Sequence, residues 1–295
     1  MTPTLYSRLG DTTLRKRLAT SPMRAERAAR FVAKFLLYSS AAHLPFILRA
    51  VTFSHRGPEA GSLRVLMYHK VSRRFRPGLS VRTASFRRQQ QFLAEHFNVI
   101  SLDEVEAYLD AHKPLPANAV LLTFDDGYRN NLSEAYPILK EFGHSAVIFI
   151  PTDYIGGRTL YHDRHLLNPD PVLGWNEIKS VQDVFEVGSH GCSHRSLRGL
   201  APEEVRREVC SSKQILENLL GIQVRAFAYP NGSASDFDQT TEKIVSEAGY
   251  RFCFTTLAGT NPPKMNPMRL QRDGVEDFGM SYFRRLLDGS RVLLA

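Results

Sequence analysis

The feature that most constrains the fold is a short apolar run, residues 120–124, which ends abruptly on Asp125, Asp126 and Gly127. Such a run is typical of a strand covered on both faces, as in a parallel sheet with helices on either side. In these folds, active sites gather at the carboxyl ends of the strands. The pattern therefore predicts a buried strand that delivers two carboxylates to a functional edge, although a solvated Asp-Gly turn would also explain this segment alone.

Strand and helix patterns alternate along the chain from residue 64 onward. Strands are expected at residues 64–69, 120–124, 146–150, 184–187, 224–229 and 250–255. Helices are expected at residues 86–97, 102–109, 131–142, 175–182, 202–220 and 238–248. This alternation predicts an α/β fold with a parallel sheet, closed or nearly closed. The 295 residues suffice for one α/β barrel, which typically needs roughly 250.

Basic residues are concentrated at the N-terminus. Residues 1–56 hold ten Lys or Arg against Asp11 and Glu26, while the whole chain has a net charge of +8. The remainder is therefore balanced, which argues against a basic nucleic-acid groove. Because apolar residues recur at helical spacing beside these basic ones, we expect a basic amphipathic helical arm at residues 1–56 and a folded domain at residues 57–295.

The arm either lies on an anionic membrane surface or packs on its own domain. Residues 35–48 are uncharged if His43 is neutral, a run shorter than the roughly 20 residues that a spanning helix needs. No cleavable signal peptide is evident at Met1, although a start at Met23 would look more signal-like. These features favour a peripheral membrane or cytoplasmic protein.

Two histidines, His190 and His194, follow the strand expected at residues 184–187. Histidines at this spacing can bind one metal ion. Because both the His pair and the Asp pair follow strands of a parallel sheet, we expect them on the same face of the fold. Two imidazoles and one carboxylate leave a position open for water, as in catalytic zinc sites. Two solvated loop histidines are the alternative.

The three cysteines are widely spaced without a CxxC pair, so neither a disulfide framework nor a thiolate zinc site is indicated.

Four short motifs in the chain resemble those of a known family. Residues 123–128 (TFDDGY) and 189–194 (SHxxxH) resemble the first two motifs of the NodB-homology polysaccharide deacetylases, carbohydrate esterase family 4. Residues 226–232 (AFAYPNG) resemble the third motif, and residues 270–272 (LQR) a later one. The resemblance covers residues 64–275. It implies a distorted (β/α) barrel that hydrolyses N-acetyl groups on amino-sugar polymers, in a bacterial-type cell envelope.

The resemblance also implies a role for each site residue. The side chains of Asp126, His190 and His194 would hold a divalent metal ion, for which Zn²⁺ is the expected match and Co²⁺, Ni²⁺ or Mn²⁺ are the alternatives. Asp125 would be the catalytic base, and the backbone N–H of Asn231 would help to polarise the acetyl oxygen. The expected partners are an N-acetylated glycan and, through residues 1–56, an anionic membrane surface, but no nucleic acid.

The chain departs from the family pattern at two points. Many relatives have an arginine that orients the base at the position of Ala228, so Arg272 or Arg269 would have to substitute. Many also take their catalytic acid from a C-terminal Leu-x-x-His, yet no histidine follows His194. The chain instead resembles the subgroup that opens with a Tyr-His strand, as in poly-N-acetylglucosamine deacetylases. His69 is therefore the expected general acid, and a structural histidine that caps the strand is the alternative.

Other classes of function fit the sequence less well. A two-histidine, one-carboxylate site can hold Fe(II) in an oxygenase, but Asp125 would then have no task. A non-catalytic glycan-binding barrel would not need Asp125 or His69. Glycoside hydrolysis by Asp125 and Asp126 is disfavoured, because adjacent residues on one strand end do not flank a scissile bond at the required separation of about 5 Å or more.

Overall fold

The computed structural model describes residues 61–288, apart from residues 74–78, 112, 165, 167 and 168. The arm expected at residues 1–56 lies outside the described residues, so it and the domain boundary stay predictions. No helix in the described part of the chain is long and apolar enough to cross a membrane.

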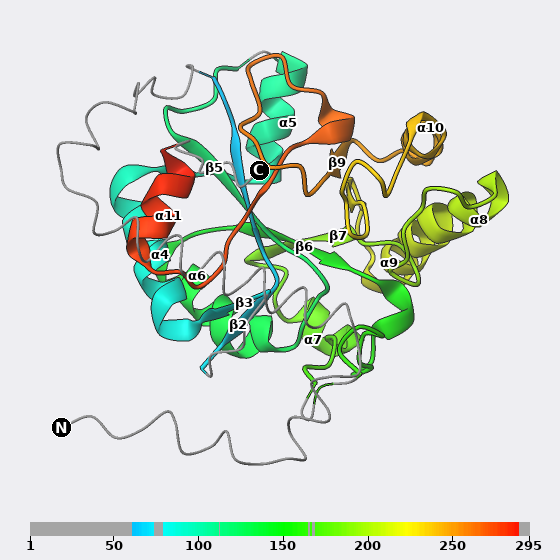
Figure 1. The fold of residues 1–295 in the computed structure, drawn as a ribbon, viewed down its shortest axis with the longest axis horizontal. Coiled ribbons are helices and arrows are strands. Elements are labelled where there is room, and N and C mark those ends of the chain that lie inside the picture. The colour runs from blue at the N-terminus through cyan, green and yellow to red at the C-terminus, as the bar shows by residue number, and fades with distance from the viewer. Residues whose placement is uncertain (1–60, 74–78, 112, 165, 167–168, 289–295) are drawn as a thin grey trace, which may run out of the picture. The chain divides into compact units, whose positions relative to one another are not determined.

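A curled parallel sheet forms the centre of the fold (Figure 1). In spatial order its strands are β10 (Asp273–Gly274), β1 (Arg64–Tyr68), β5 (Ala119–Phe124), β6 (Ala146–Ile150), β7 (Phe185–Ser189), β8 (Ala226–Ala228) and β9 (Phe252–Phe254). All neighbours in this order pair in parallel. A further strand, β4 (Asn98–Val99), pairs with β5. The expected parallel α/β sheet is confirmed.

One segment links the two edges of the sheet. Leu270 forms a parallel bridge with Phe254 at the end of β9. Three residues later, Asp273 pairs with Leu66 of β1. Because residues 270–274 bond to both edges, the sheet curls into the distorted barrel that the sequence predicts.

Helices cover the outside of the sheet. They are α4 (Thr83–His96), α5 (Leu102–Ala111), α6 (Tyr136–Phe142), α7 (Trp175–Lys179), α8 (Pro202–Arg206), α9 (Ser212–Leu220), α10 (Gln239–Glu247) and α11 (Met280–Leu287). Short helical turns are η2 (Asn131–Ala135), η3 (Thr152–Tyr154), η4 (Arg207–Ser211) and η5 (Pro267–Arg269). The small strands β2 (Lys70–Ser72) and β3 (Ser80–Arg82) form a separate parallel pair.

Local chemistry explains the ends of several helices. Helix α5 begins with a capping box, in which the Ser101 hydroxyl accepts from the Glu104 N–H and the Glu104 carboxylate accepts from the Ser101 N–H. Helix α9 ends at Gly221, whose φ of 69° lies in the left-handed region that favours glycine. The sequence predictions at both ends are confirmed, whereas α4 starts three residues before the expected position.

The strand side chains alternate between two buried clusters. In β5, Val120, Leu122 and Phe124 pack toward the helices. Leu121 belongs to a second cluster, to which β1, β6, β8 and β9 also contribute and which fills the curled sheet. Because side chains alternate along a strand, Asp125 continues the inner row at the carboxyl end of β5.

Candidate active site

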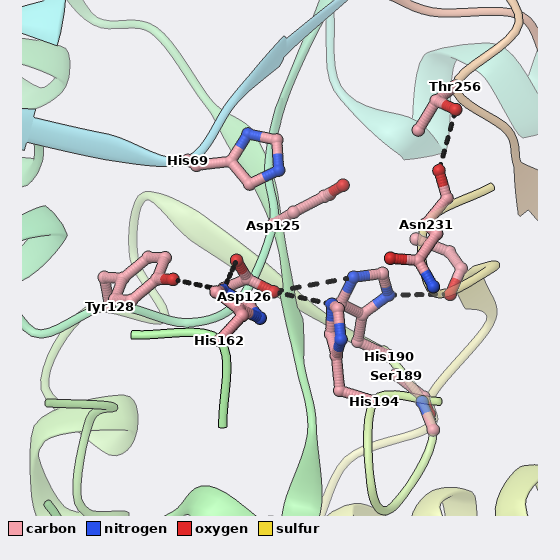
Figure 2. Close-up of polar contacts among 12 residues, drawn as sticks. His69, Asp125, Asp126, Tyr128, His162, Ser189, His190, His194, Asn231 and Thr256 are labelled. Carbon is pink, nitrogen blue, oxygen red and sulfur yellow. Dashed lines mark hydrogen bonds and ion pairs between the residues drawn. The ribbon is translucent and has the colours of Figure 1, made fainter. Parts of the chain in front are cut away.

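Three potential metal ligands converge at the carboxyl ends of β5 and β7 (Figure 2). Asp126 Oδ1 lies 3.0 Å from His194 Nε2 and 3.8 Å from His190 Nε2. The three potential ligand atoms are all within 4.8 Å of one another, and all three side chains are buried. Metal–ligand bonds of about 2.0–2.2 Å can meet at one ion in a space of this size.

The hydrogen bond of His190 defines which ring nitrogen faces the site. His190 Nδ1 lies 2.7 Å from the carbonyl oxygen of Ala228. Because a carbonyl oxygen can only accept, Nδ1 carries the proton and Nε2 presents its lone pair toward Asp126. Burial lowers the pKa of His190 to about 4. The ring is therefore neutral near pH 7, which is the form that binds a metal.

The buried polar atoms of the site fit a metal ion. Asp126 Oδ1 is buried and has no hydrogen-bond donor among the described residues. Burial is the largest single influence on the pKa of Asp126 and raises it, but the interactions with His194, His69 and His190 together hold the pKa well below its usual value. An ionised carboxylate beside two imidazoles is a donor set that Zn²⁺ prefers.

Backbone strain marks the same region. Five described residues other than glycine have a positive φ, and three of them are Asp126 at 72°, His194 at 58° and Asn231 at 59°. Such conformations cost of the order of 1 kcal/mol or more and persist where the surrounding structure imposes them. The fold therefore holds these three residues in place against a local preference.

Asp125 forms a buried ion pair with Arg272. Arg272 Nη1 donates to Asp125 Oδ1 at 2.6 Å and Nη2 donates to Oδ2 at 2.8 Å, while Nε donates to the Thr255 carbonyl at 2.8 Å. Burial is the largest single influence on the pKa of Asp125 and raises it, but the charge and hydrogen bonds of Arg272 together with the charges of His190 and His69 lower the pKa overall. Of the two arginines considered from the sequence, Arg272 contacts Asp125, whereas Arg269 pairs with Glu242.

His69 follows β1, and its half-buried ring lies near Asp125 (Figure 2). The backbone carbonyl of His69 accepts a hydrogen bond from the Asn131 side chain at 2.9 Å, but no hydrogen bond of the ring is found in the described part of the chain. Burial lowers the pKa of His69, opposed by the charges of Asp125 and Asp126. The ring is thus placed next to the carboxylates without a structural hydrogen bond of its own.

Asn231 lies in a tight turn after β8. Its carbonyl accepts from the Thr256 hydroxyl at 2.8 Å (Figure 2), and the Gly232 carbonyl accepts from the Thr256 N–H at 2.8 Å. A Cβ on Gly232 would lie 2.9 Å from the Thr256 nitrogen, so the turn requires glycine. The backbone N–H of Asn231 donates to no described residue.

Sequence reasoning missed two members of this cluster. His162 Nε2 lies 3.0 Å from the Tyr128 hydroxyl and 3.8 Å from Asp126 Oδ2. Tyr128 was part of the TFDDGY motif but had no assigned role. His162 belongs to an irregular segment between η3 and α7, where no strand end or motif spacing indicates a site.

The chain is similar to known polysaccharide deacetylases. The family model for polysaccharide deacetylase matches residues 112–253. The Bacillus subtilis protein YxkH is 30% identical over 201 residues, which are 67% of this chain and 65% of YxkH. A poly-β-1,6-N-acetyl-D-glucosamine N-deacetylase of Escherichia coli K12 is 24% identical over 215 residues, 61% of this chain. This chain spans 31% of the E. coli protein, so it covers less than two thirds of either relative.

Solved structures show the same fold. IcaB from Ammonifex degensii superposes with a TM-score of 0.66 at 25% identity, covering 78% of this chain and 97% of that protein. The match therefore includes nearly the whole of the compared domain.

Proposed function

This chain belongs to the polysaccharide deacetylase family, as its motifs indicated, and on that premise we propose that it removes N-acetyl groups from an amino-sugar glycan and releases acetate. The observation that carries the proposal is the pairing of Asp125 with Arg272 directly beside the potential metal ligands. A carboxylate held ionised next to a metal site is suited to accept a proton from water.

Asp126, His190 and His194 are the residues that would hold a divalent metal ion. We favour Zn²⁺ from the donor set, with Co²⁺, Ni²⁺ or Mn²⁺ as alternatives. When bound, such an ion supplies Lewis-acid chemistry, which makes water more acidic and polarises a carbonyl group.

The remaining residues would carry out the proton transfers. Asp125 accepts the proton of the attacking water, and the two hydrogen bonds from Arg272 keep its carboxylate ionised and oriented. The free N–H of Asn231 donates to the oxygen of the acetyl group as negative charge develops there. His69 gives a proton to the departing amine, because an amine leaves poorly as an anion.

This division of labour favours hydrolysis over the other classes. The buried Asp125–Arg272 pair keeps a charged carboxylate beside the site. In an Fe(II) oxygenase or a non-catalytic binding barrel, this carboxylate would have no role. The name of the E. coli relative supports a glycan that contains N-acetylglucosamine as substrate. We propose such a glycan, either polymeric or lipid-linked.

We further propose that residues 57–295 form the catalytic domain and residues 1–56 form an arm on an anionic membrane surface, which would place the protein peripherally at the cell envelope. The support is the charge distribution, because the sequence of residues 1–56 contains ten basic residues and only two acidic ones.

Acetate release is the direct test. Purified full-length protein is incubated with oligomers of β-1,6-linked N-acetylglucosamine and with a panel of other N-acetylated glycans, with chelator and after addition of Zn²⁺ or Co²⁺. We expect release from at least one glycan, loss with chelator, and recovery with metal. Activity that persists in a metal-free preparation would contradict the proposed metal site, and no release from any glycan would contradict the proposed reaction.

A further inference from the structure

The second carboxylate oxygen of Asp126 has its own surroundings. Oδ1 faces the two imidazoles, whereas Oδ2 lies on the side of His162 at 3.8 Å from Nε2. That separation is an ion-pair distance and too long for a direct hydrogen bond. The His162 ring is held instead by the Tyr128 hydroxyl at 3.0 Å (Figure 2).

His162 is not a fourth ligand in this arrangement. Among the described residues, the group whose donor atoms all approach one another within 4.8 Å contains Asp126, His190 and His194 but not His162. The centroid of the His162 ring lies 5.3 Å from that of the His194 ring, and His162 lies on the Oδ2 side of the Asp126 carboxylate. Its place is that of a group that orients a ligand and does not bind the ion itself.

His162 comes from the segment between η3 and α7, residues 155–174, which we call the η3–α7 loop. Backbone hydrogen bonds tie this loop to the turn that follows Asp126. The Leu173 N–H donates to the Gly127 carbonyl at 2.9 Å, and the Arg129 N–H donates to the Pro171 carbonyl at 2.8 Å. The loop and the Asp126 turn are therefore fixed relative to each other at one end of the loop.

A buried ion pair fixes the part of the loop that carries His162. Lys70 and Asp163 are only 5% and 6% exposed, and Lys70 Nζ lies 2.5 Å from Asp163 Oδ2. The same ammonium group lies 4.2 Å from the centre of the Tyr128 ring. Lys70 thus contacts Tyr128 and the residue next to His162, and it directly follows His69 in the chain.

We propose that Tyr128 and His162 are positioning residues of the metal centre, which hold Asp126 so that its Oδ1 stays directed toward the two imidazoles. The Lys70–Asp163 pair maintains this arrangement by fixing the loop that carries His162. The inference rests on the proposed function, because it requires Asp126 to bind a metal ion.

The test measures metal affinity and does not depend on turnover. The Zn²⁺ dissociation constant of the purified full chain is determined by competition with a chromophoric chelator. We expect His162→Ala to weaken binding by about 10- to 100-fold, the range known for groups that orient metal ligands. Tyr128→Phe removes only the hydroxyl and should weaken binding less, while leaving the folded content measured by circular dichroism unchanged.

A double variant separates positioning from a general loss of structure. Lys70→Met should weaken Zn²⁺ binding because it releases His162. Once His162 is absent, Lys70 has no further effect, so the double variant Lys70→Met with His162→Ala should bind Zn²⁺ as tightly as His162→Ala alone. Lys140→Met is the matched control, because it breaks the exposed ion pair with Asp183 and should leave affinity unchanged. His96→Ala controls for the loss of a histidine, because His96 lies outside the site.

The outcomes distinguish this inference from the proposed function. A wild-type chain that binds no Zn²⁺ would overturn both. Tight wild-type binding that His162→Ala and Tyr128→Phe leave unchanged would overturn this inference alone. Additive losses in the double variant would overturn the role given to Lys70. If His162→Ala does not fold, His162→Asn keeps a polar side chain and is measured in its place, with the same expected weakening.

Discussion

Replacing Arg272 by methionine should remove the only bidentate partner that the Asp125 carboxylate has in the described part of the chain. Methionine approximates the length of the arginine stem but leaves the buried carboxylate without a counter-charge. Arg272 has no exposed surface and donates at 2.6 and 2.8 Å to the two oxygens of Asp125. Removing one partner of such a buried pair typically costs about 3–5 kcal/mol of unfolding free energy.

The loss should depend on pH in a defined direction. In the wild type the pKa of Asp125 lies below its ordinary 3.8, so the pair contributes stability above about pH 4 and loses it as the pH falls further. In Arg272→Met, burial dominates and raises the pKa of Asp125. The ionised carboxylate then costs stability, and this cost grows as the pH rises through the ordinary value. The variant should therefore lose more stability at pH 7 than at pH 4.

Urea unfolding measures this difference, with chelator present so that metal loss at low pH does not contribute. The double variant Asp125→Asn with Arg272→Met removes the unpaired charge and should recover much of the stability at pH 7 without recovering activity. Arg272→Lys keeps the charge but not the two parallel hydrogen bonds, so it should retain more stability than Arg272→Met. Equal losses at both pH values, together with no recovery in the double variant, would refute this reasoning.

Four further predictions address the other residues. Asp126→Asn should lose Zn²⁺ measured by atomic emission, whereas Asp125→Asn should retain it and be inactive; loss of metal from both would show that Asp125 is also a ligand. His69→Ala should lower kcat on the N-acetyl amide by about 100-fold but affect an activated acetate ester much less, and equal losses would assign His69 a structural role. Removal of residues 1–56 should release the protein from anionic vesicles in a sedimentation assay while retaining turnover of a soluble oligomer. Tyr161→Ala should raise KM and leave Zn²⁺ content unchanged, because Tyr161 is 47% exposed and its ring centroid lies 6.1 Å from that of His194; an unchanged KM would exclude a contact with the sugar.

Strong local patterns explain why much of the fold was predictable. A continuous apolar run such as β5 has few alternatives to a buried strand, and its position ahead of Asp125 determined the site edge. The spacing of His190 and His194 after another strand then indicated a shared face. By contrast, β10 has two residues and forms only because β1 provides its partner. Such an element leaves no periodic pattern in the sequence.

Parts of the site depend on contacts that no local pattern shows. Arg269 and Arg272 are three residues apart, and the sequence alone does not tell which one enters the barrel. Leu270 pairs with β9 and directs Arg272 inward, where its guanidinium lies 5.5 Å from the centre of the Phe149 ring. His162 was missed because its position depends on the buried Lys70–Asp163 pair, which joins residues far apart in the chain.

The central claim is that this site hydrolyses an N-acetyl amide with Asp125 as the base. The most direct measurement follows acetate and free amine together during turnover of a purified N-acetylglucosamine oligomer by the Zn²⁺-loaded chain. We predict that one amine appears for each acetate, and that Asp125→Asn abolishes both while keeping its Zn²⁺. Acetate without amine, or undiminished release by Asp125→Asn, would contradict the account.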